Sequence, residues 1–376
     1  MTAFKKKMLY VWSKNLAAES LMKTKKIINE NCEVTVNLKI KDTENTYLLR
    51  IKNNFVPQRF IPGQFVMLKH NPGSSDPLLA RPFSIFRKFN ENEFEILYRV
   101  CGKGTDLLSN IKKGDYVSVT GPLGNGFNAL SDFQGLQNGG STKIVKNIHV
   151  LIAGGIGIAP LFSLPDFIKN KGRAGNESTA AHRVNDSADN ADNNERSNIN
   201  TEDSGRTPSN RALEDCDCGD NNKFILYYGS KTEKELYFRY SIHSDYDEVY
   251  FATDDGSFGY KGSVVDLLFK NINDYCNQNE KSTERLNVNF YACGPKPMLS
   301  YLINKLRAQN KSNMLDSGIL NEYAVQVSLE EHFACGIGVC LGCVVKINSA
   351  HSNNFVFKRV CKDGPVFNAF ELQDYC

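Results

Sequence analysis

Three cysteines near the C-terminal end restrict the fold of this chain more than any other feature. Cys335, Cys340 and Cys343 follow a C-x4-C-x2-C spacing, and Cys361 follows after a short β-like segment. Thiolates at this spacing are typical ligands of a plant-type [2Fe–2S] cluster. The sequence therefore predicts an iron–sulfur centre held by four cysteines, in a small β-rich domain at 322–376.

Glycines between the cysteines support this prediction. Gly336, Gly338 and Gly342 lack a Cβ atom, so they allow the loop to curl and to point N–H groups at the sulfurs. A structural zinc site is one alternative, but such sites usually contain two C-x2-C pairs and this chain has one. Free or buried cysteines are the other alternative, and the dense grouping with glycine argues against them.

Composition limits the class of protein. The chain has 376 residues, which suggests two or three domains. A net charge of +3 gives no reason to expect a nucleic-acid partner. The sequence contains no run of 18 apolar residues and no visible secretory signal, so we expect no membrane span. Thiolate ligands fit a reducing compartment, and we expect a cytoplasmic protein.

Two segments are predicted to lie outside the packed domains. Residues 1–28 form a basic extension. A transit peptide is one interpretation, but the segment lacks arginine. The other interpretations are a surface helix and a translation start placed too far upstream. Residues 172–222 contain no Phe, Tyr or Trp and are rich in Asn, Asp, Ser and Arg. Such a segment buries too little apolar surface to offset its ordering entropy, so we expect a disordered insert.

Short strands are predicted between residues 29 and 137. Residues 94–100 alternate with a period of two, and 47–51, 64–69 and 115–120 are further strand candidates separated by turn residues. Several short strands at this spacing favour an antiparallel β-barrel. Arg-Pro-Phe-Ser at 81–84 can hold a flavin through its guanidinium and hydroxyl, although a plain strand end would explain it equally well.

Residues 145–310 are predicted to form an α/β domain with a parallel sheet, interrupted by the insert. The apolar run 148–153 is typical of a buried parallel strand, and it leads into a glycine turn at 154–160 and a helix-like stretch. This arrangement suits a dinucleotide pyrophosphate, although an ordinary tight turn would look similar. Cys293, after a later strand, lies either near a nicotinamide or in the core.

Four motifs in this order resemble the ferredoxin–NADP reductase-like flavoproteins. They are Arg-Pro-Phe-Ser, Gly-Gly-Ile-Gly-Ile-Ala-Pro, Cys-Gly-Pro-Lys-Pro-Met and the cysteine group. The chain is more closely similar to the electron-transfer subunits of NAD-dependent (class 1B) dihydroorotate dehydrogenases, over 28–171 and 223–376. The stretches 252–257, 328–331 and 359–367 carry this closer resemblance.

The resemblance implies a role for each motif. FAD would be bound by Arg81, Pro82, Phe83, Ser84, Tyr98, Arg99, Val100, Gly104 and Thr105. NAD would face Gly154, Gly155, Gly157, Pro160, Thr253, Asp254, Cys293, Gly294 and Pro295. The cluster would be held by Cys335, Cys340, Cys343 and Cys361.

The resemblance also implies a partner and a route. A catalytic subunit with FMN would oxidise dihydroorotate in pyrimidine biosynthesis, in a heterotetramer with two copies of each subunit. Electrons would pass from its FMN through the cluster and FAD to NAD, and no side-chain acid or base is expected in this chain. A flavin and iron–sulfur subunit of another reductase, of ferredoxin, sulfite or hydrogenase type, is the alternative.

Overall fold

The computed structural model describes most of the chain outside the predicted extension and insert. The described residues are 27–43, 45–70, 75–128, 146–174, 222–278, 286–311, 320–348, 354–373 and 375. The predicted extension 1–28 and insert 172–222 lie outside them except at their ends. Within the described residues, no helix is long and apolar enough to cross a membrane.

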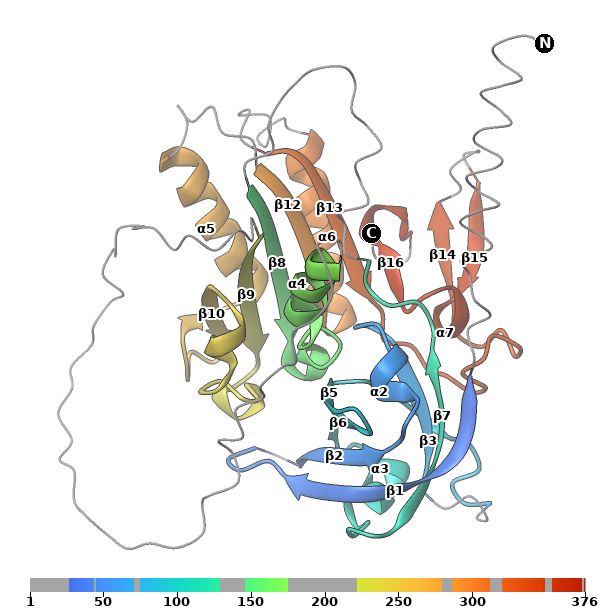
Figure 1. The fold of residues 1–376 in the computed structure, drawn as a ribbon. Helices are drawn as coiled ribbons and strands as arrows, with labels where there is room; N and C mark the ends of the chain where they lie inside the picture. The colour runs from blue at the N-terminus through green and yellow to red at the C-terminus, as the bar shows by residue number, and fades with distance from the viewer. Residues whose placement is uncertain are drawn as a thin grey trace, which may run out of the picture.

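Seven antiparallel strands form the first sheet, which curls into a barrel-like layer (Figure 1). They are β1 (Ile28–Lys39), β2 (Thr46–Lys52), β3 (Phe65–Lys69), β4 (Arg81–Ser84), β5 (Arg87–Asn90), β6 (Glu93–Arg99) and β7 (Tyr116–Leu123), in the order β4-β3-β7-β1-β2-β6-β5. Phe94 and Ile96 are fully buried, as the period of two predicts. Glu95 between them is also buried, because Arg50 and Arg87 pair with its carboxylate.

A second sheet of seven strands carries the α/β fold. It contains β8 (Lys146–Gly154), β9 (Asn222–Ser230), β10 (Glu248–Thr253), β11 (Tyr260–Lys261), β12 (Leu286–Cys293), β13 (Leu320–Ser328) and β16 (Val366–Asn368), in the order β11-β10-β9-β8-β12-β13-β16. All neighbours are parallel except β13 and β16. The strand order reverses between β8 and β12, and ligands of open α/β sheets bind at such a switch point.

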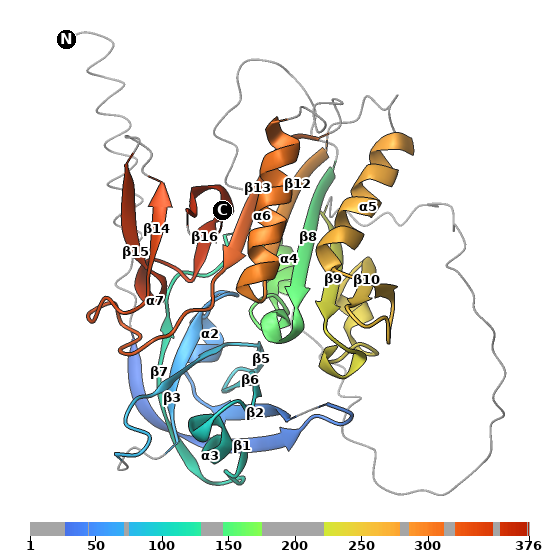
Figure 2. The same cartoon turned by 180° about the vertical axis from the view of Figure 1, so that it is seen from behind.

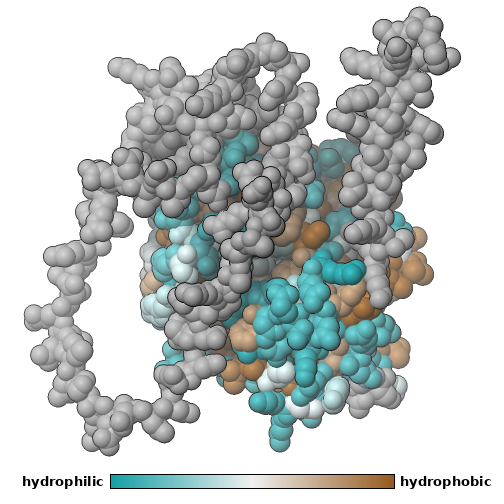
Figure 3. Space-filling view, in the orientation of Figure 1, coloured by the Kyte–Doolittle hydropathy of each residue, from teal (hydrophilic) through white to brown (hydrophobic). Residues whose placement is uncertain are grey.

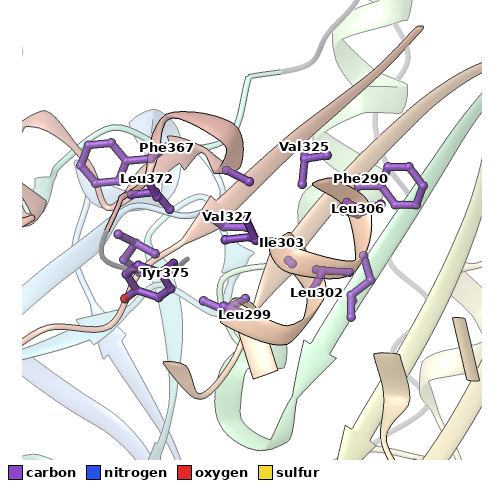
Figure 4. Packing of buried hydrophobic residues seen from close by; sticks show 14 of the residues in the cluster. Phe290, Leu299, Leu302, Ile303, Leu306, Val325, Val327, Phe367, Leu372 and Tyr375 are labelled. Carbon is purple, nitrogen blue, oxygen red and sulfur yellow. The ribbon is translucent and has the colours of Figure 1, made fainter. Parts of the chain in front are cut away.

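Helices cover both faces of the second sheet. Figure 1 shows α4 (Leu164–Ala174) on one face, and Figure 2 shows α5 (Val264–Gln278) and α6 (Lys296–Lys311) on the other. The apolar residues of α6 recur at helical spacing and pack against β13 and the C-terminal segment (Figure 4). They are Leu299, Leu302, Ile303 and Leu306. Burial of each such side chain stabilises the fold by about 1.5–3 kcal/mol.

The C-terminal segment extends the second sheet instead of forming a wholly separate unit. After β13 the chain makes the cysteine loop, then the hairpin β14 (Val344–Asn348) and β15 (Phe355–Arg359) and the single turn α7 (Val360–Asp363). It then returns to the sheet as β16, which pairs with β13. The predicted boundary at residue 322 therefore falls inside a strand of the α/β sheet.

Candidate flavin, nicotinamide and iron–sulfur sites

A cavity of about 550 Å³ opens between the first sheet, the second sheet and the segment after β13. Eight of the residues predicted to bind FAD line it: Arg81, Pro82, Phe83, Ser84, Tyr98, Arg99, Gly104 and Thr105. The ninth, Val100, is not among the lining residues, and its backbone N–H donates to the Asn45 carbonyl oxygen at 2.8 Å. The fold thus gathers three separate motifs around one space.

Cations gather where β4 and α3 (Lys103–Ser109) meet. A Cβ atom on Gly104 would lie 3.1 Å from Arg81 Nε, so the Arg81 side chain passes close to the start of α3. Arg81, Arg99 and Lys103 all line the cavity. In this structure Arg99 pairs with Glu235 and Lys103 with Asp76. Cations in the lining of one cavity suit a diphosphate, because charged donors make the strongest hydrogen bonds to phosphate oxygens.

Thr105 organises the glycine-rich loop through its hydroxyl. Its Oγ1 accepts hydrogen bonds from the N–H groups of Cys101, at 2.9 Å, and Gly102, at 3.2 Å. The same hydroxyl donates to the Gly102 carbonyl oxygen at 2.9 Å. The side chain therefore shapes the loop, and any contact with a ligand adds to that structural role.

Aromatic rings form another wall of the cavity. Tyr98 stacks on Tyr47 with ring centroids 5.5 Å apart, and Phe83 packs edge-on against it at 5.8 Å. The Tyr98 hydroxyl donates to Asn37 Oδ1 at 3.1 Å. Burial raises the pKa of Tyr98, so this ring stays neutral and fixed. A planar, apolar group such as a flavin ring fits beside such a wall.

The opposite wall comes from the ends of β12 and β13. Cys293 is buried, and burial raises the pKa of its thiol well above the usual value, with the nearby Glu330 charge acting in the same direction. Ser328 donates a hydrogen bond that opposes this shift. Glu330 is open to the cavity, yet burial by the surrounding protein raises the pKa of its carboxyl as well. Cys293 is thus both part of the buried core and part of the cavity lining, so its predicted place near a nicotinamide stays a prediction.

Sequence reasoning assigned no role to Ser328, Glu330 or Phe333, which all line the cavity. The only signal was their place directly after a strand of a parallel sheet, where ligands usually bind. The stretch 328–331 was used for the resemblance, but nothing in its residue types points to a flavin.

The two glycine turns at the switch point touch each other. A Cβ atom on Gly154 would lie 2.8 Å from Pro295 Cδ, and one on Gly294 would lie 3.1 Å from Gly154 Cα. A Cβ atom on Gly157 would meet the Cys293 carbonyl oxygen at 2.4 Å. These glycines therefore allow two loops to approach. Gly155, with φ +53° and open space beside it, leaves room for a ligand.

The turn after β8 does not lead directly into a helix. It forms the 3₁₀ turn η2 (Gly155–Ile158), and α4 begins only at Leu164. Pro160 is buried behind the turn, whereas the neighbouring Ile156 and Ala159 line the cavity. A dinucleotide would therefore meet this turn and the facing loop at Cys293, Gly294 and Pro295, rather than the first turn of α4.

At the end of β10, Thr253 is buried and stabilises the following loop, whereas Asp254 is exposed. Thr253 is fully buried; its Oγ1 donates to the Phe258 carbonyl oxygen at 2.9 Å and accepts from the Phe258 N–H at 3.0 Å. Its hydroxyl is thus occupied by the loop. Asp254 is exposed and its N–H donates to the Ser230 carbonyl oxygen at 3.0 Å, which ties the ends of β9 and β10 together.

The four predicted ligand cysteines meet as two pairs. The Cys340 N–H donates to the sulfur of Cys335 at 3.5 Å, and their side chains also interact. The Cys361 N–H donates to the sulfur of Cys343 at 3.4 Å, and these thiols also interact. Cys340 is exposed, whereas Cys343 and Cys361 are buried. One pair thus lies at the surface and the other inside.

Cys335 and Cys361 differ in the pKa of their thiols. Burial opposes ionisation of Cys335, but N–H groups of the loop donate to its sulfur and lower its pKa to about 6. Burial and the Cys343 thiol raise the pKa of Cys361 to about 12. Metal coordination would remove the proton of the Cys361 thiol, because a coordinated thiol is deprotonated.

Among the described residues, no three His, Cys, Asp or Glu side chains converge closely enough to hold one metal ion. A structural zinc ion needs four ligands around one point. A [2Fe–2S] cluster contains two irons and is held by four thiolates. The two neighbouring pairs of thiols would supply the four ligands of such a cluster.

The three glycines of the cysteine loop differ in backbone conformation. Gly336 and Gly338 have φ angles of +70° and +82°, in the region that favours glycine. Gly342 does not share this conformation; Leu341 beside it has φ +57° instead. A Cβ atom on Gly336 would also lie 2.7 Å from Met67 Sδ, so this glycine lets the loop approach β3.

Comparisons with known proteins agree with this arrangement. The family model of the oxidoreductase FAD-binding domain matches residues 31–127. The model of the iron–sulfur cluster binding domain of dihydroorotate dehydrogenase B matches residues 330–373. In solved structures, the chain resembles an NADH-dependent reduced ferredoxin-NADP oxidoreductase with a TM-score of 0.57 and 22% identity, covering 91% of this chain and 89% of the other. At this identity the likeness shows the fold alone.

Curated relatives are similar over nearly their full length. The dihydroorotate dehydrogenase B (NAD(+)) electron transfer subunit of Geobacillus thermodenitrificans is 30% identical over 330 residues, covering 88% of this chain and 93% of the relative. The subunit of the same name from Fusobacterium nucleatum is 29% identical, covering 92% and 98%. This chain belongs to the family of dihydroorotate dehydrogenase B (NAD+) electron transfer subunits.

Proposed function

We propose that this chain connects a catalytic subunit that oxidises dihydroorotate with NAD+, through a [2Fe–2S] cluster and FAD. The names of the relatives contain the reaction, the acceptor and the role of the subunit. When bound, FAD exchanges electrons with NAD in pairs and with the cluster singly, which explains its place between them. Oxidation of dihydroorotate removes two electrons, so the partner needs a group such as FMN that also releases them singly.

The continuity between the cavity and the cysteine loop carries this proposal. The segment after β13 lines the cavity with Ser328, Glu330 and Phe333 and reaches Cys335 two residues later. Phe333 packs against Phe65 of the first sheet with ring centroids 5.0 Å apart. One short, packed segment would thus hold FAD and the cluster close to each other, as electron transfer requires.

The residues of the cavity have separate tasks in this proposal. Arg81 and Lys103 bind the diphosphate of FAD, and Tyr98 and Phe83 hold its ring system and exclude water from it. Cys293 and the glycine turns receive the nicotinamide end of NAD. The loops after β9 and β10, including Asp254, receive the other end of NAD.

The catalytic subunit docks beside the cluster in this proposal. Figure 3 shows hydrophobic residues on the side of the molecule where Figure 1 places the loop after β13. Exposed apolar side chains of this loop and of β15 form the cluster rim: Ile337, Val339, Leu341, Phe355, Val356 and Phe357. Exposed apolar patches of this kind mark protein interfaces. Two copies of each subunit form the expected assembly.

Anaerobic addition of NADH to the purified chain tests this function without the partner. We expect the flavin absorbance to bleach and the electron paramagnetic resonance signal of a reduced [2Fe–2S] cluster to appear. A bleached flavin beside an unreduced cluster would contradict transfer between the two groups. Absence of both changes would contradict the NAD site as well.

A further inference from the structure

Arg359 and Asp363 form a two-pronged ion pair around the turn that carries Cys361. Arg359 Nε lies 2.9 Å from Asp363 Oδ2, and Arg359 Nη2 lies 3.0 Å from Oδ1. The backbone N–H of Arg359 also donates to Asp363 Oδ2 at 2.9 Å. The two side chains are only 30% and 24% exposed, so water screens the pair incompletely. This geometry fixes both residues across the single turn α7.

The same guanidinium connects this turn to the loop of the outer cysteines. Arg359 Nη1 donates to the Gly338 carbonyl oxygen at 3.2 Å. Gly338 lies between Cys335 and Cys340 in the sequence. Arg359 therefore joins the segment that carries Cys361 to the segment that carries the outer pair of thiols.

The charge of Arg359 lies two residues from Cys361 in the sequence and is held against the loop of the outer pair of thiols by the hydrogen bond to Gly338. The Asp363 carboxylate is its counter-charge. Lys358 and Lys362 are the neighbouring cations, and Lys362 lies with its aliphatic stem beside Gly338.

We propose that Arg359 is a positioning residue that holds the fourth cluster ligand in place and, balanced by Asp363, sets the reduction potential of the cluster. The proposal rests on cluster binding by the four cysteines. Reduction adds one electron to the cluster, and no bond of Arg359 or Asp363 changes. A nearby cation stabilises the reduced, more negative state and raises the potential, whereas a nearby anion lowers it.

Removal of either charge alone distinguishes an electrostatic effect on the reduction potential from a general loss of structure around the cluster. Arg359→Gln leaves the carboxylate unbalanced, so we expect a lower midpoint potential. Asp363→Asn leaves the guanidinium unbalanced and keeps an oxygen for the Arg359 N–H, so we expect a higher potential. Arg359→Lys keeps the positive charge but loses the two-pronged contact with Asp363. We therefore expect a smaller shift of the potential than in Arg359→Gln, and faster loss of the cluster than in the unchanged protein. Lys358→Gln, which removes a neighbouring exposed cation, is the control and shifts the potential less than Arg359→Gln.

Redox titration of the full-length protein, followed by electron paramagnetic resonance, measures these shifts. Iron and sulfide content is measured on the same samples. Shifts of the same sign in Arg359→Gln and Asp363→Asn, or a shift in Lys358→Gln as large as in Arg359→Gln, would overturn the proposal. An unvarying iron content when Cys340 or Cys361 is replaced would instead overturn the ligand assignment on which it rests.

Discussion

A Cβ atom placed on Gly157 would lie 2.4 Å from the carbonyl oxygen of Cys293. The turn after β8 and the turn after β12 therefore touch backbone to backbone at the switch point of the α/β sheet. No side chain fits between them, so the relative position of the two loops depends on this glycine.

Replacement of Gly157 by alanine should separate the two turns. We expect a loss of about 1–3 kcal/mol of unfolding free energy, measured by chemical denaturation, and slower flavin reduction by NADH. Gly102→Ala is the matched control for the unfolding free energy, because nothing lies within 4 Å of its Cβ position and its φ of 177° suits any residue. An equal loss in both variants would contradict the contact as the cause.

Replacement of Cys340 by serine should remove or destabilise the cluster. Cys340 is the exposed member of the outer pair, and a serine oxygen is a poorer ligand for iron than a thiolate. Iron and sulfide analysis and the visible spectrum measure the loss. Cys101→Ser, which removes another exposed thiol, should keep the full iron content. Full iron content in Cys340→Ser would remove this residue from the ligand set.

Introduction of a charge on the cluster rim should weaken binding of the catalytic subunit. Phe357 is 59% exposed on β15, and a lysine there would have to be buried unpaired at the interface. We expect at least about a tenfold increase in the dissociation constant, measured by calorimetry. Leu38→Lys on β1 is the control, because this residue is 61% exposed and lies outside the rim. Equal weakening by both variants would place the interface elsewhere.

Asp245 should make stability depend on pH. Burial and the charge of Asp166 raise the pKa of its carboxyl, so its contribution is fully present below about pH 4 and is lost as pH rises through the folded-state pKa. Asp245→Asn should therefore raise the melting temperature at pH 7 and lose this advantage below about pH 4. A gain that persists unchanged at low pH would have another cause than ionisation.

Much of the fold follows from local patterns. The period of two at 94–100 predicted β6, and the apolar run at 148–153 predicted β8. The membership of β13 and β16 in the second sheet did not follow, because it depends on pairing with strands distant in the sequence. No local pattern distinguishes a strand of the cluster domain from one that completes a neighbouring sheet.

The residues of the site also fall into those that a sequence motif predicts and those that only the fold reveals. Motifs such as Arg81–Ser84 and the cysteine spacing carry their chemistry in their residue types, and the structure gathers them. Glu330 has no motif of its own; only the cavity beside it suggests a role. Thr253 was expected to face NAD. Its burial and its two hydrogen bonds to Phe258 arise from the fold of the loop, and no local sequence pattern predicts them.

Production of NADH from dihydroorotate tests electron transfer through this chain most directly. The chain is co-expressed with a dihydroorotate dehydrogenase catalytic subunit, and orotate and NADH are measured together in the purified complex. We expect the two products in equal amounts with both subunits present, and no NADH from either subunit alone or from a complex with Cys340→Ser. Equal NADH formation by the catalytic subunit alone, or orotate without NADH in the complete complex, would contradict this function.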